Sequence, residues 1–456
     1  MEITLYTAEY AQLFSLPFWE AIYRIFFWYF GWLPVAVTFL YGASILWLDY
    51  CSGKWAATQK FVLLAIDVPK MNDQSPKAVE NLFTYLMGVQ SNPNLLEVWW
   101  EGKFQLGFSF EIVGIDGYIQ FLVRTPSAFR PNIETAIYSQ YPDAEISEVS
   151  DYLVGVPEQY PDAEYDIWGA EMMPVASQYL PIRCYKEFSS AGGAPGTSYK
   201  DPLATLMDLM SSFRPGEQLW FQMVLVPADA GWTKGADAFI AKLIGDKEKI
   251  MIQTPIERKQ VEMASEKKNK VAFHTKMRVV YFAKKKLMDK AKVVNGFMGY
   301  MRQFGEGNLN GFRPYSPTMT STSYFMAASR LNSRKNNILS AYRGRSLSKG
   351  SNSYVLNVEE LATLWHLPLD AVTKAPLLQR AAARRIEAPM SLPTMETAAA
   401  VTHDNIFATG YTWPEEKKAE EAKIDFNEFL AEEIKREEHQ EEIKEDRPPG
   451  NLPFVD

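Results

Sequence analysis

The longest apolar run of the chain covers residues 25–48 and contains no charged side chain. As a helix, a run of 24 residues is about 36 Å long, and the hydrocarbon core of a bilayer is about 30 Å thick. We therefore predict a single transmembrane helix over residues 25–48, preceded by an interfacial segment over residues 1–24. Aromatic side chains typical of a membrane interface lie at both ends of the run; they are Trp28, Tyr29, Trp32, Trp47, Tyr50 and Trp55.

Charged residues on either side of this run predict its orientation. Acidic side chains predominate before the run, with Arg24 as the exception, and Lys54 and Lys60 follow it. Positive charges favour the cytoplasmic side, so we expect a single-pass inner-membrane protein with its N-terminus outside and its C-terminal bulk in the cytoplasm. A cleaved signal peptide is disfavoured because the residues before the run are acidic and the run is too long.

Beyond the span, residues 60–152 alternate between strand and helix patterns. The apolar run 61–69 predicts a buried strand, and residues 104–112 alternate strictly, with Ser109 and Glu111 on the polar side, which predicts a half-buried strand. Asp116–Gly117 is a hairpin signal, and Pro131 favours a helix start. The order β-α-β-β-α-β predicts a ferredoxin-like module over residues 60–152.

Residues 165–330 predict a second, expanded ferredoxin-like module with an insertion. Its expected elements are a strand at Leu180–Phe188, a helix after Asp201-Pro202, a strand at Glu217–Val226 and a charged, solvated insertion at 246–269. The fold class is therefore α+β: one transmembrane helix followed by tandem modules. We expect a helical and extended segment at 331–393, then a linker and charged tail at 394–456.

The net charge of −8 is concentrated in that tail. Residues 414–456 contain fifteen Asp and Glu against seven Lys and Arg, so the rest of the chain is neutral overall. Cysteine occurs only as Cys51 and Cys184, too few for a disulfide framework. These features favour a reducing compartment for the bulk of the chain.

A six-residue repeat, QYPDAE, begins at Gln140 and again at Gln159. Asp143 and Asp162 are candidate oxygen ligands for a cation, but Ca²⁺ needs six to eight ligands. The Tyr-Pro-Asp order instead favours a turn used twice. The glycine-rich loop at 192–200 lacks the spacing of a phosphate-binding loop, and the four histidines are isolated. We predict no catalytic, cofactor-binding or metal-binding residues, and no enzyme activity.

Residues 246–292 carry fourteen Lys and Arg against six Asp and Glu. This excess favours an anionic partner, and three alternatives stay open: nucleic acid through its phosphates, anionic lipid, or the acidic tail. No base-reading motif accompanies the charges. The candidate surface consists of Lys267, Lys268, Lys270, Lys284, Lys285, Lys286, Lys290 and Lys292.

Several stretches together resemble one bacterial family. They include FSFEIVGIDGYIQFLVRTPSAFR, IYSQYPDAEISEVSDY, YDIWGAEM, DPLATLMDLMSSFRPGEQLWFQMVLVP and LNVEELATLWHLP, and the resemblance covers roughly residues 60–392. The family is the membrane-anchored, largely uncharacterised domain found next to, or fused ahead of, type IV secretion and conjugation ATPases in bacteria with reduced genomes. The resemblance implies tandem ferredoxin-like modules.

In fused members of that family an ATPase follows the region that ends here near Pro393, whereas this chain continues into a short tail. We therefore expect a non-enzymatic inner-membrane scaffold of a type IV secretion-like or DNA-translocation machine. It would contact lipid, self-assemble as a homo-oligomer and recruit a separate secretion-type ATPase. The alternative is a membrane-tethered nucleic-acid-binding protein that uses the 246–292 surface to bind DNA.

Overall fold

The computed structural model describes residues 16–27, 32–67, 72, 74–190, 201–245 and 254–368, which belong to one compact unit ending at Arg384. The predicted tail at 394–456, the glycine-rich loop at 192–200 and the aromatic residues Trp28 and Tyr29 lie outside the described residues.

The N-terminal apolar run forms parts of two helices, α2 (Phe18–Phe27) and α3 (Trp32–Thr58). Of the helices described, α3 is the one long and apolar enough to cross a membrane. Residues 25–27 of the predicted span lie in α2 and residues 32–48 lie in α3, which continues to Thr58.

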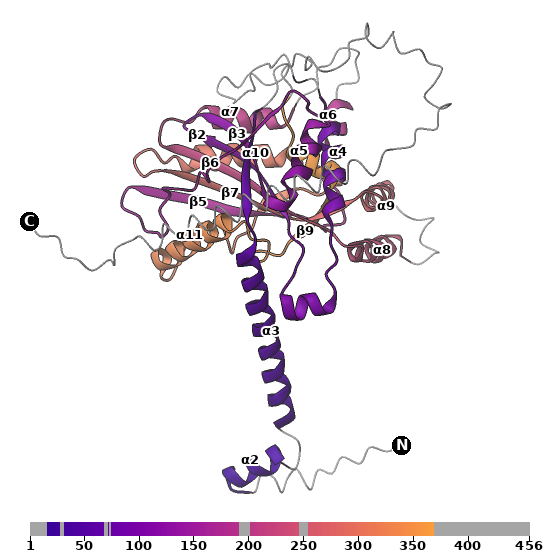
Figure 1. Ribbon diagram of the computed structural model, residues 1–456, viewed down its shortest axis with the longest axis vertical. Coiled ribbons are helices and arrows are strands. Elements are labelled where there is room, and N and C mark those ends of the chain that lie inside the picture. The colour runs from indigo at the N-terminus through magenta and orange to yellow at the C-terminus, as the bar shows by residue number, and fades with distance from the viewer. Residues whose placement is uncertain are drawn as a thin grey trace, which may run out of the picture. The chain divides into compact units, whose positions relative to one another are not determined.

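The rest of the described chain is built on one nine-stranded sheet in which every paired strand is antiparallel (Figure 1). The strands follow the order β4-β1-β3-β2-β6-β7-β5-β8, and β9 pairs with β7. Their bounds are β1 (Phe61–Asp67), β2 (Phe108–Ile115), β3 (Tyr118–Pro126), β4 (Glu145–Glu148), β5 (Tyr165–Pro174), β6 (Glu217–Pro227), β7 (Ala272–Lys284), β8 (Phe312–Pro314) and β9 (Tyr354–Asn357).

The two predicted modules contribute the two halves of this sheet. The halves meet where β2 pairs with β6, with Phe108 opposite Leu225 and Ile115 opposite Gln218. Within each half the first strand lies between the third and the fourth, so the halves repeat one strand order. The polypeptide backbone is thus hydrogen-bonded continuously across the boundary between the predicted modules.

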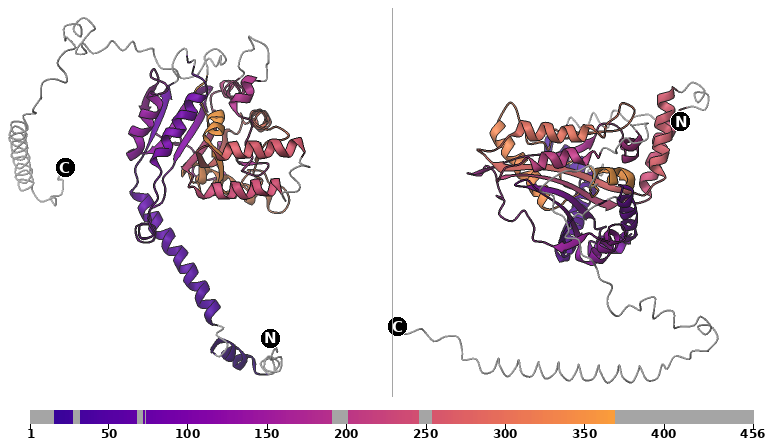
Figure 2. Two further views of the ribbon diagram at one scale, coloured as in Figure 1. Left: turned by 90° about the vertical axis from the view of Figure 1, so that its right-hand side faces the viewer. Right: turned by 90° about the horizontal axis from the view of Figure 1, so that it is seen from above.

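Helices cover the sheet, as the ribbon views show (Figure 2). One face of the sheet carries the larger hydrophobic core. Trp365 lies near its centre, 1% exposed, and its ring is 4.9 Å from that of Phe110 and 6.5 Å from that of Phe83. Because Trp365 follows α12, the segment predicted as an extension completes this core. The helices of this face are α4 (Lys77–Leu86), α5 (Arg130–Tyr138), α7 (Leu203–Ser211), α10 (Lys290–Arg302) and α12 (Val358–Leu364).

The other face is covered by α11 (Ala327–Arg343) and by the segment after β4. Tyr342 of α11 packs there on Trp220 of β6, with ring centres 5.6 Å apart. This second layer buries the polar side of β2, which was predicted to be solvated. Ser109 is 2% exposed and Glu111 is 0% exposed, so the half-buried prediction was wrong. The alternation showed one apolar face but gave no sign of a helix covering the other.

The strand predicted at Leu180–Phe188 is absent. Residues 181–184 are irregular, and α6 (Tyr185–Ser190) follows them. Side chains of α12 accept the backbone N–H groups that a sheet would have used: Ile182 donates to Glu360 and Tyr185 donates to Thr363, each over 3.0 Å. The first strand in the second half of the sheet is β5 instead.

The remaining described elements lie in connections. The insertion between β6 and β7 contains two helices in contact with each other, and Lys267 on the second is buried rather than solvated as expected. The elements are α8 (Gly231–Ile244), α9 (Pro255–Lys268) and three short turns of helix, η1 (Met87–Val89), η2 (Glu97–Glu101) and η3 (Ser127–Phe129).

Candidate functional site

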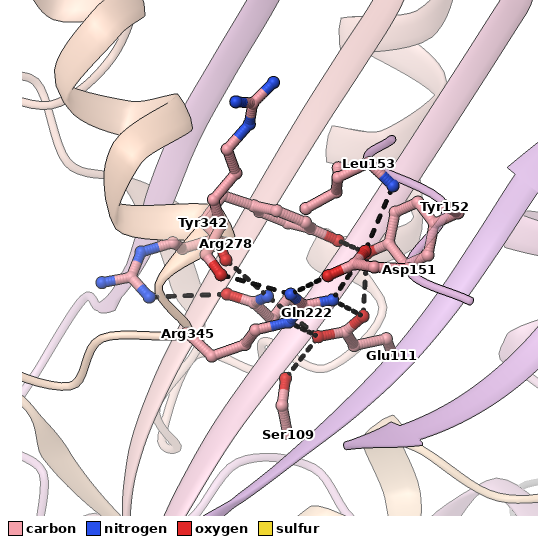
Figure 3. Close-up of polar contacts among 10 residues, drawn as sticks. Ser109, Glu111, Asp151, Tyr152, Leu153, Gln222, Arg278, Tyr342 and Arg345 are labelled. Carbon is pink, nitrogen blue, oxygen red and sulfur yellow. Dashed lines mark hydrogen bonds and ion pairs between the residues drawn. The ribbon is translucent and has the colours of Figure 1, made fainter. Parts of the chain in front are cut away.

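A cluster of charged side chains, buried except for Asp151, which is 37% exposed, lies on the α11 face of the sheet (Figure 3). Glu111 comes from β2, Asp151 follows β4, and Arg345 follows α11. The guanidinium of Arg345 donates from Nε to Glu111 Oε1 over 3.0 Å and from Nη2 to Asp151 Oδ1 over 3.2 Å. The side chains of Arg345 and Glu111 are 4% and 0% exposed. Neither charge is stable at such depth without its partner.

Glu111 also accepts hydrogen bonds from three uncharged donors. These are the Ser109 hydroxyl at 2.6 Å, the Gln222 amide at 3.0 Å and the Tyr152 hydroxyl at 2.8 Å. The hydroxyls of Tyr152 and Tyr342 are themselves 2.8 Å apart. Both oxygens of Glu111 are therefore occupied by donors from the sheet and from the layer that covers it.

A second buried ion pair joins Arg278 of β7 to Glu171 of β5, with Nε and Oε1 3.0 Å apart and both side chains 0% exposed. Arg278 also donates to Gln222 Oε1 over 3.5 Å, which links the two ion pairs. Its Nη2 donates to two backbone carbonyls of the loop at 344–353, and Glu171 accepts from the backbone N–H of Ser351 in the same loop. The two pairs therefore hold the loop after α11 against the sheet.

The charges of this cluster reinforce one another. Burial acts to raise the pKa of the Asp151 carboxyl, but the hydrogen bond and positive charge of Arg345 outweigh burial and lower that pKa. Burial likewise disfavours the charged form of Arg345, yet Glu111 and Asp151 raise the pKa of its guanidinium. Burial, with the charge of Glu111, raises the pKa of Tyr342 well above its usual value. The arrangement favours permanent ion pairs beside a neutral phenol, which suits a structural role.

A pocket lies beside the cluster, between the end of α3 and the sheet. It is lined by Ala56 of α3, Phe61 of β1, Arg124 of β3 and the loop at 344–353. The guanidinium carbon of Arg124 is 4.0 Å from the centre of the Phe61 ring. Burial, together with the positive charge of Arg345, lowers the pKa of Arg124 to about 10. Its guanidinium has no hydrogen-bond partner among the described residues, so it can donate to a polar ligand in the pocket.

The two QYPDAE copies form turns in the structure. In the first, the backbone N–H of Ala144 donates to the Tyr141 carbonyl over 3.1 Å. In the second, Asp162 Oδ2 accepts from the backbone N–H groups of Glu164 and Tyr165, over 2.8 and 2.7 Å. Within the described ranges no three His, Cys, Asp or Glu side chains are grouped so that they could hold a metal ion.

The structure separates the eight candidate lysines into groups at the two ends of β7, which is a 13-residue strand about 43 Å long. In the first group, Lys267 is 1% exposed and lies 2.9 Å from Glu360. Lys268 is paired with Asp237, and Lys270 with Glu359. The carboxylates neutralise all three lysines of this group.

Around the other end of β7 the pairing is less complete. Lys284 lies 3.2 Å from Glu164, and Lys290 lies 3.3 Å from Asp166. The ammonium groups of the other three lysines pair with no carboxylate among the residues described. That of Lys285 donates to the Asp162 carbonyl, that of Lys292 donates to the Ser212 carbonyl, and Lys286 lines a shallow hollow with Lys285 and Lys290. The backbone N–H of Lys292 donates to Asp289 Oδ1 over 3.0 Å. Much less uncompensated charge is present than the sequence count indicated.

The described members of the predicted aromatic belt lie on α3. Trp32 and Trp47 are each 40% exposed, and Tyr50 is 63% exposed. Trp55 packs edge-on against Phe104, with ring centres 4.9 Å apart. The C-terminal end of α3 therefore carries aromatic side chains, and one of them, Trp55, contacts the folded part of the chain that contains the sheet, which we call the sheet domain.

Two features of the molecule, the Glu111–Arg345 ion pair and the adjacent Trp99 and Trp100, were not predicted from the sequence. The partners Glu111 and Arg345 are 234 positions apart, and no local pattern connects them. The adjacent tryptophans Trp99 and Trp100, which lie between Glu97 and Glu101, did carry a signal, because two neighbouring tryptophans among charged residues are unusual for a solvated connection.

Comparison with known families gives one assignment. No curated protein matches the chain. A family model described as a domain of unknown function, DUF8128, matches residues 58–379, which is more than half of the 456-residue chain and includes the whole sheet. The chain therefore belongs to the DUF8128 family, whose description assigns no activity.

Proposed function

We propose that this protein is a membrane-anchored, non-enzymatic scaffold of a type IV secretion-like or DNA-translocation machine, which assembles with copies of itself and recruits a separate ATPase. The observation that carries the proposal is the combination of α3, a long apolar helix whose membrane-length stretch is not covered by the rest of the protein, with a folded domain attached directly to its end. Such a helix needs an apolar surrounding, and a bilayer provides one.

The repeated strand order supports two ferredoxin-like units within the sheet. Each half places its first strand between its third and fourth, and each has a helix after its first strand and another after its third. In this proposal β2 and β6 are equivalent edge strands of the two units. Their antiparallel pairing removes two exposed edges that would otherwise favour uncontrolled association.

The charges around α3 support an inner-membrane location with the sheet domain in the cytoplasm. Glu20 precedes α3, whereas Lys54 in its last turns and Lys60 just after it carry positive charge. Basic residues are enriched on the cytoplasmic side of such helices.

A candidate contact for self-assembly lies just before α11. Tyr324, Phe325 and Met326 are 91%, 81% and 60% exposed. Tyr324 and Met326 have φ angles of 70° and 51°, a left-handed conformation that costs about 1–3 kcal/mol for such residues and is concentrated at functional sites. Exposed apolar groups of this kind mark protein contacts. We propose that this turn packs against a second copy of the chain.

The native mass of the full-length protein in mild detergent tests the proposal. We expect a defined multi-subunit particle that nuclease leaves intact, and we expect Phe325→Ser to lower its mass. Val154→Ser is the matched control, because Val154 is also highly exposed, at 80%, but lies in another loop. A single-chain mass for the unmodified protein would contradict self-assembly, and ATP hydrolysis by the purified protein would contradict the non-enzymatic role.

DNA binding is measured on the same preparation. Binding that survives moderate salt and disappears when Lys284, Lys285 and Lys286 are replaced by Ser would replace the scaffold with the nucleic-acid-binding alternative.

A further inference from the structure

The turn at residues 94–104 exposes more large apolar surface than a solvated connection normally does. Leu95, Leu96 and Trp100 are 80%, 69% and 69% exposed, and Trp99 is 41% exposed. All four lie within or next to η2. Contiguous exposed apolar side chains generally mark a surface that contacts a partner or a membrane.

This turn is held in one conformation by its own polar groups. The backbone N–H of Asn94 donates to Glu97 Oε2 over 2.8 Å, and the backbone N–H of Glu97 donates back to Asn94 Oδ1 over 2.9 Å. Lys103 pairs with Glu97 over 3.1 Å and with Glu101 over 2.7 Å. The apolar side chains are therefore presented from a preformed support, which lowers the entropy lost when they bind.

The same turn is packed directly on α3. The indole N–H of Trp47 donates to the Trp99 carbonyl over 2.8 Å, and the rings of Trp47 and Trp100 are 5.8 Å apart, edge to face. Gly102 lies so close to α3 that a Cβ atom there would be 2.2 Å from the backbone carbon of Cys51. The exposed leucines and Trp100 are thus attached at a definite level along α3, between Trp47 and Cys51.

That level matches the expected position of a membrane interface. The helical rise from Trp32 to Trp47 is about 23 Å and from Trp32 to Cys51 about 29 Å, while the hydrocarbon core is about 30 Å thick. If Trp32 lies at one interface, Trp47 and Cys51 lie close to the other. Tryptophan and tyrosine are enriched at this depth, as Trp47, Tyr50 and Trp100 are here.

We infer that the turn at 94–104 is a second membrane contact, which places Leu95, Leu96 and Trp100 in the interface of the bilayer crossed by α3. This inference rests on the proposed membrane span. A lipid partner is favoured because the apolar surface continues that of α3 and lies at its interfacial level. Lys103 pairs with both Glu97 and Glu101, so the turn keeps a single net negative charge. Two attachments would restrict the tilt of the sheet domain on the membrane.

The test uses the full-length protein in phosphatidylcholine vesicles with an environment-sensitive fluorophore on Leu96→Cys. Both native cysteines, Cys51 and Cys184, are buried, so the introduced thiol is labelled selectively. Tyr118→Cys is the matched control: Tyr118 is 52% exposed but lies in the hairpin at the opposite end of β2, about 26 Å of strand away. Carbonate extraction of each sample measures the insertion of α3 independently.

We expect the label at Leu96 to show a blue-shifted emission and quenching by nitroxide lipids, stronger for a nitroxide near the headgroup than for one near the chain end. The label at Tyr118 should show neither effect. In a Leu95→Glu, Trp100→Glu background the quenching at Leu96 should be lost while the protein still resists carbonate.

Two results overturn the inference in distinguishable ways. If the Leu96 label is not quenched by lipid while the protein resists carbonate, the turn does not contact the bilayer, and a blue shift without quenching assigns it to a contact with a second copy. If carbonate releases the unmodified protein, the proposed span fails and the second contact fails with it.

Discussion

Arg345 and Glu111 are 234 positions apart in the chain, yet Nε of Arg345 lies 3.0 Å from Oε1 of Glu111, with the two side chains 4% and 0% exposed. Their contact joins the segment after α11 to the centre of β2. The contact therefore ties a segment near the end of the described chain to the first half of the sheet. The hydroxyls of Tyr152 and Tyr342 belong to the same polar network.

Replacing Arg345 by leucine should destabilise the protein strongly. The substitution leaves the Glu111 carboxylate buried without its cation, a loss of about 3–5 kcal/mol in free energy of unfolding. In an Arg345→Leu, Glu111→Gln double variant the buried negative charge is also removed, so the loss should be smaller than the sum of the two single losses by about 1–3 kcal/mol. Chemical denaturation of the four proteins measures this coupling, and strict additivity would show that the pair is not coupled.

Gly350 lies against the other buried carboxylate and should not tolerate a side chain. Its φ is +94°, and a Cβ atom there would be 2.3 Å from Glu171 Oε1. Gly155 is the matched control, because its φ is +87° but no atom lies within 4 Å of the same Cβ position. Gly155→Ala should cost about 1–2 kcal/mol for the left-handed conformation alone.

Gly350→Ala should cost at least about 1.5 kcal/mol more than Gly155→Ala, because Glu171 must give up a hydrogen bond to a charged group. The difference between their thermal midpoints at matched pH provides the comparison. Equal losses would mean that the loop at 344–353 moves away from Glu171 at little cost.

Lys276 in β7 should make stability rise with pH in a defined range. Burial lowers the pKa of its ammonium group from 10.5 to about 8, with Glu171 opposing that effect and Arg278 adding to it. Below about 8 the lysine is protonated in both the folded and the unfolded state. Between about 8 and 10.5 the unfolded chain binds the additional proton, so the free energy of unfolding contributed by this group increases with pH.

Lys276→Met should remove this increase and stabilise the protein near pH 7 by about 1–3 kcal/mol. The Lys349 carbonyl that accepts from Lys276 also accepts from Arg278, so it keeps a donor in the variant. Chemical denaturation of both proteins from pH 7 to 10.5 measures the difference between their free energies of unfolding. The contributions of the other titrating groups cancel in this difference because both proteins contain them. Parallel curves would contradict a lowered pKa at Lys276.

Charges placed in α3 should weaken its membrane insertion. Val37 and Leu40 are 57% and 67% exposed and lie one helical turn apart in the middle of the apolar part. An arginine at the centre of a span costs about 2.5–3.5 kcal/mol, so Val37→Arg with Leu40→Arg should release the protein into the carbonate wash. Ala57→Arg, in the last turn of α3, is the control and should remain in the pellet. Retention of both variants would argue against α3 as a membrane span.

Local sequence signals predicted several elements because their causes are local. Asp116-Gly117 predicted a two-residue hairpin, and both residues have positive φ, with Ile115 paired to Tyr118. Pro131 predicted the start of a helix, and α5 begins at Arg130 with this proline in its first turn. The uncharged run at 25–48 predicted a long apolar helix, and α3 contains residues 32–48 of that run.

Predictions failed where tertiary contacts decided the outcome. The stretch Leu180–Phe188 has the composition of a strand, but Glu360 and Thr363 of α12 accept its backbone donors, and the sheet uses β5 instead. The basic segment at 246–292 was predicted to form one surface, but Lys276 and Arg278 in it are buried within β7. Other lysines of the segment, such as Lys267 and Lys284, pair with carboxylates from distant positions in the chain. Charge counting along a sequence cannot show where the counter-charges lie.

By itself the sequence determined the long apolar helix, the α+β class, the hairpin at Asp116-Gly117, the start of α5 and the turns at both QYPDAE copies, because each depends on neighbouring residues. The tertiary structure decided that the predicted modules share one sheet, that α11 buries Glu111, and that the turn at 94–104 packs on α3. Those outcomes depend on pairings between residues far apart in the chain, such as Arg345 with Glu111, which become favourable only when the surrounding layers exclude water.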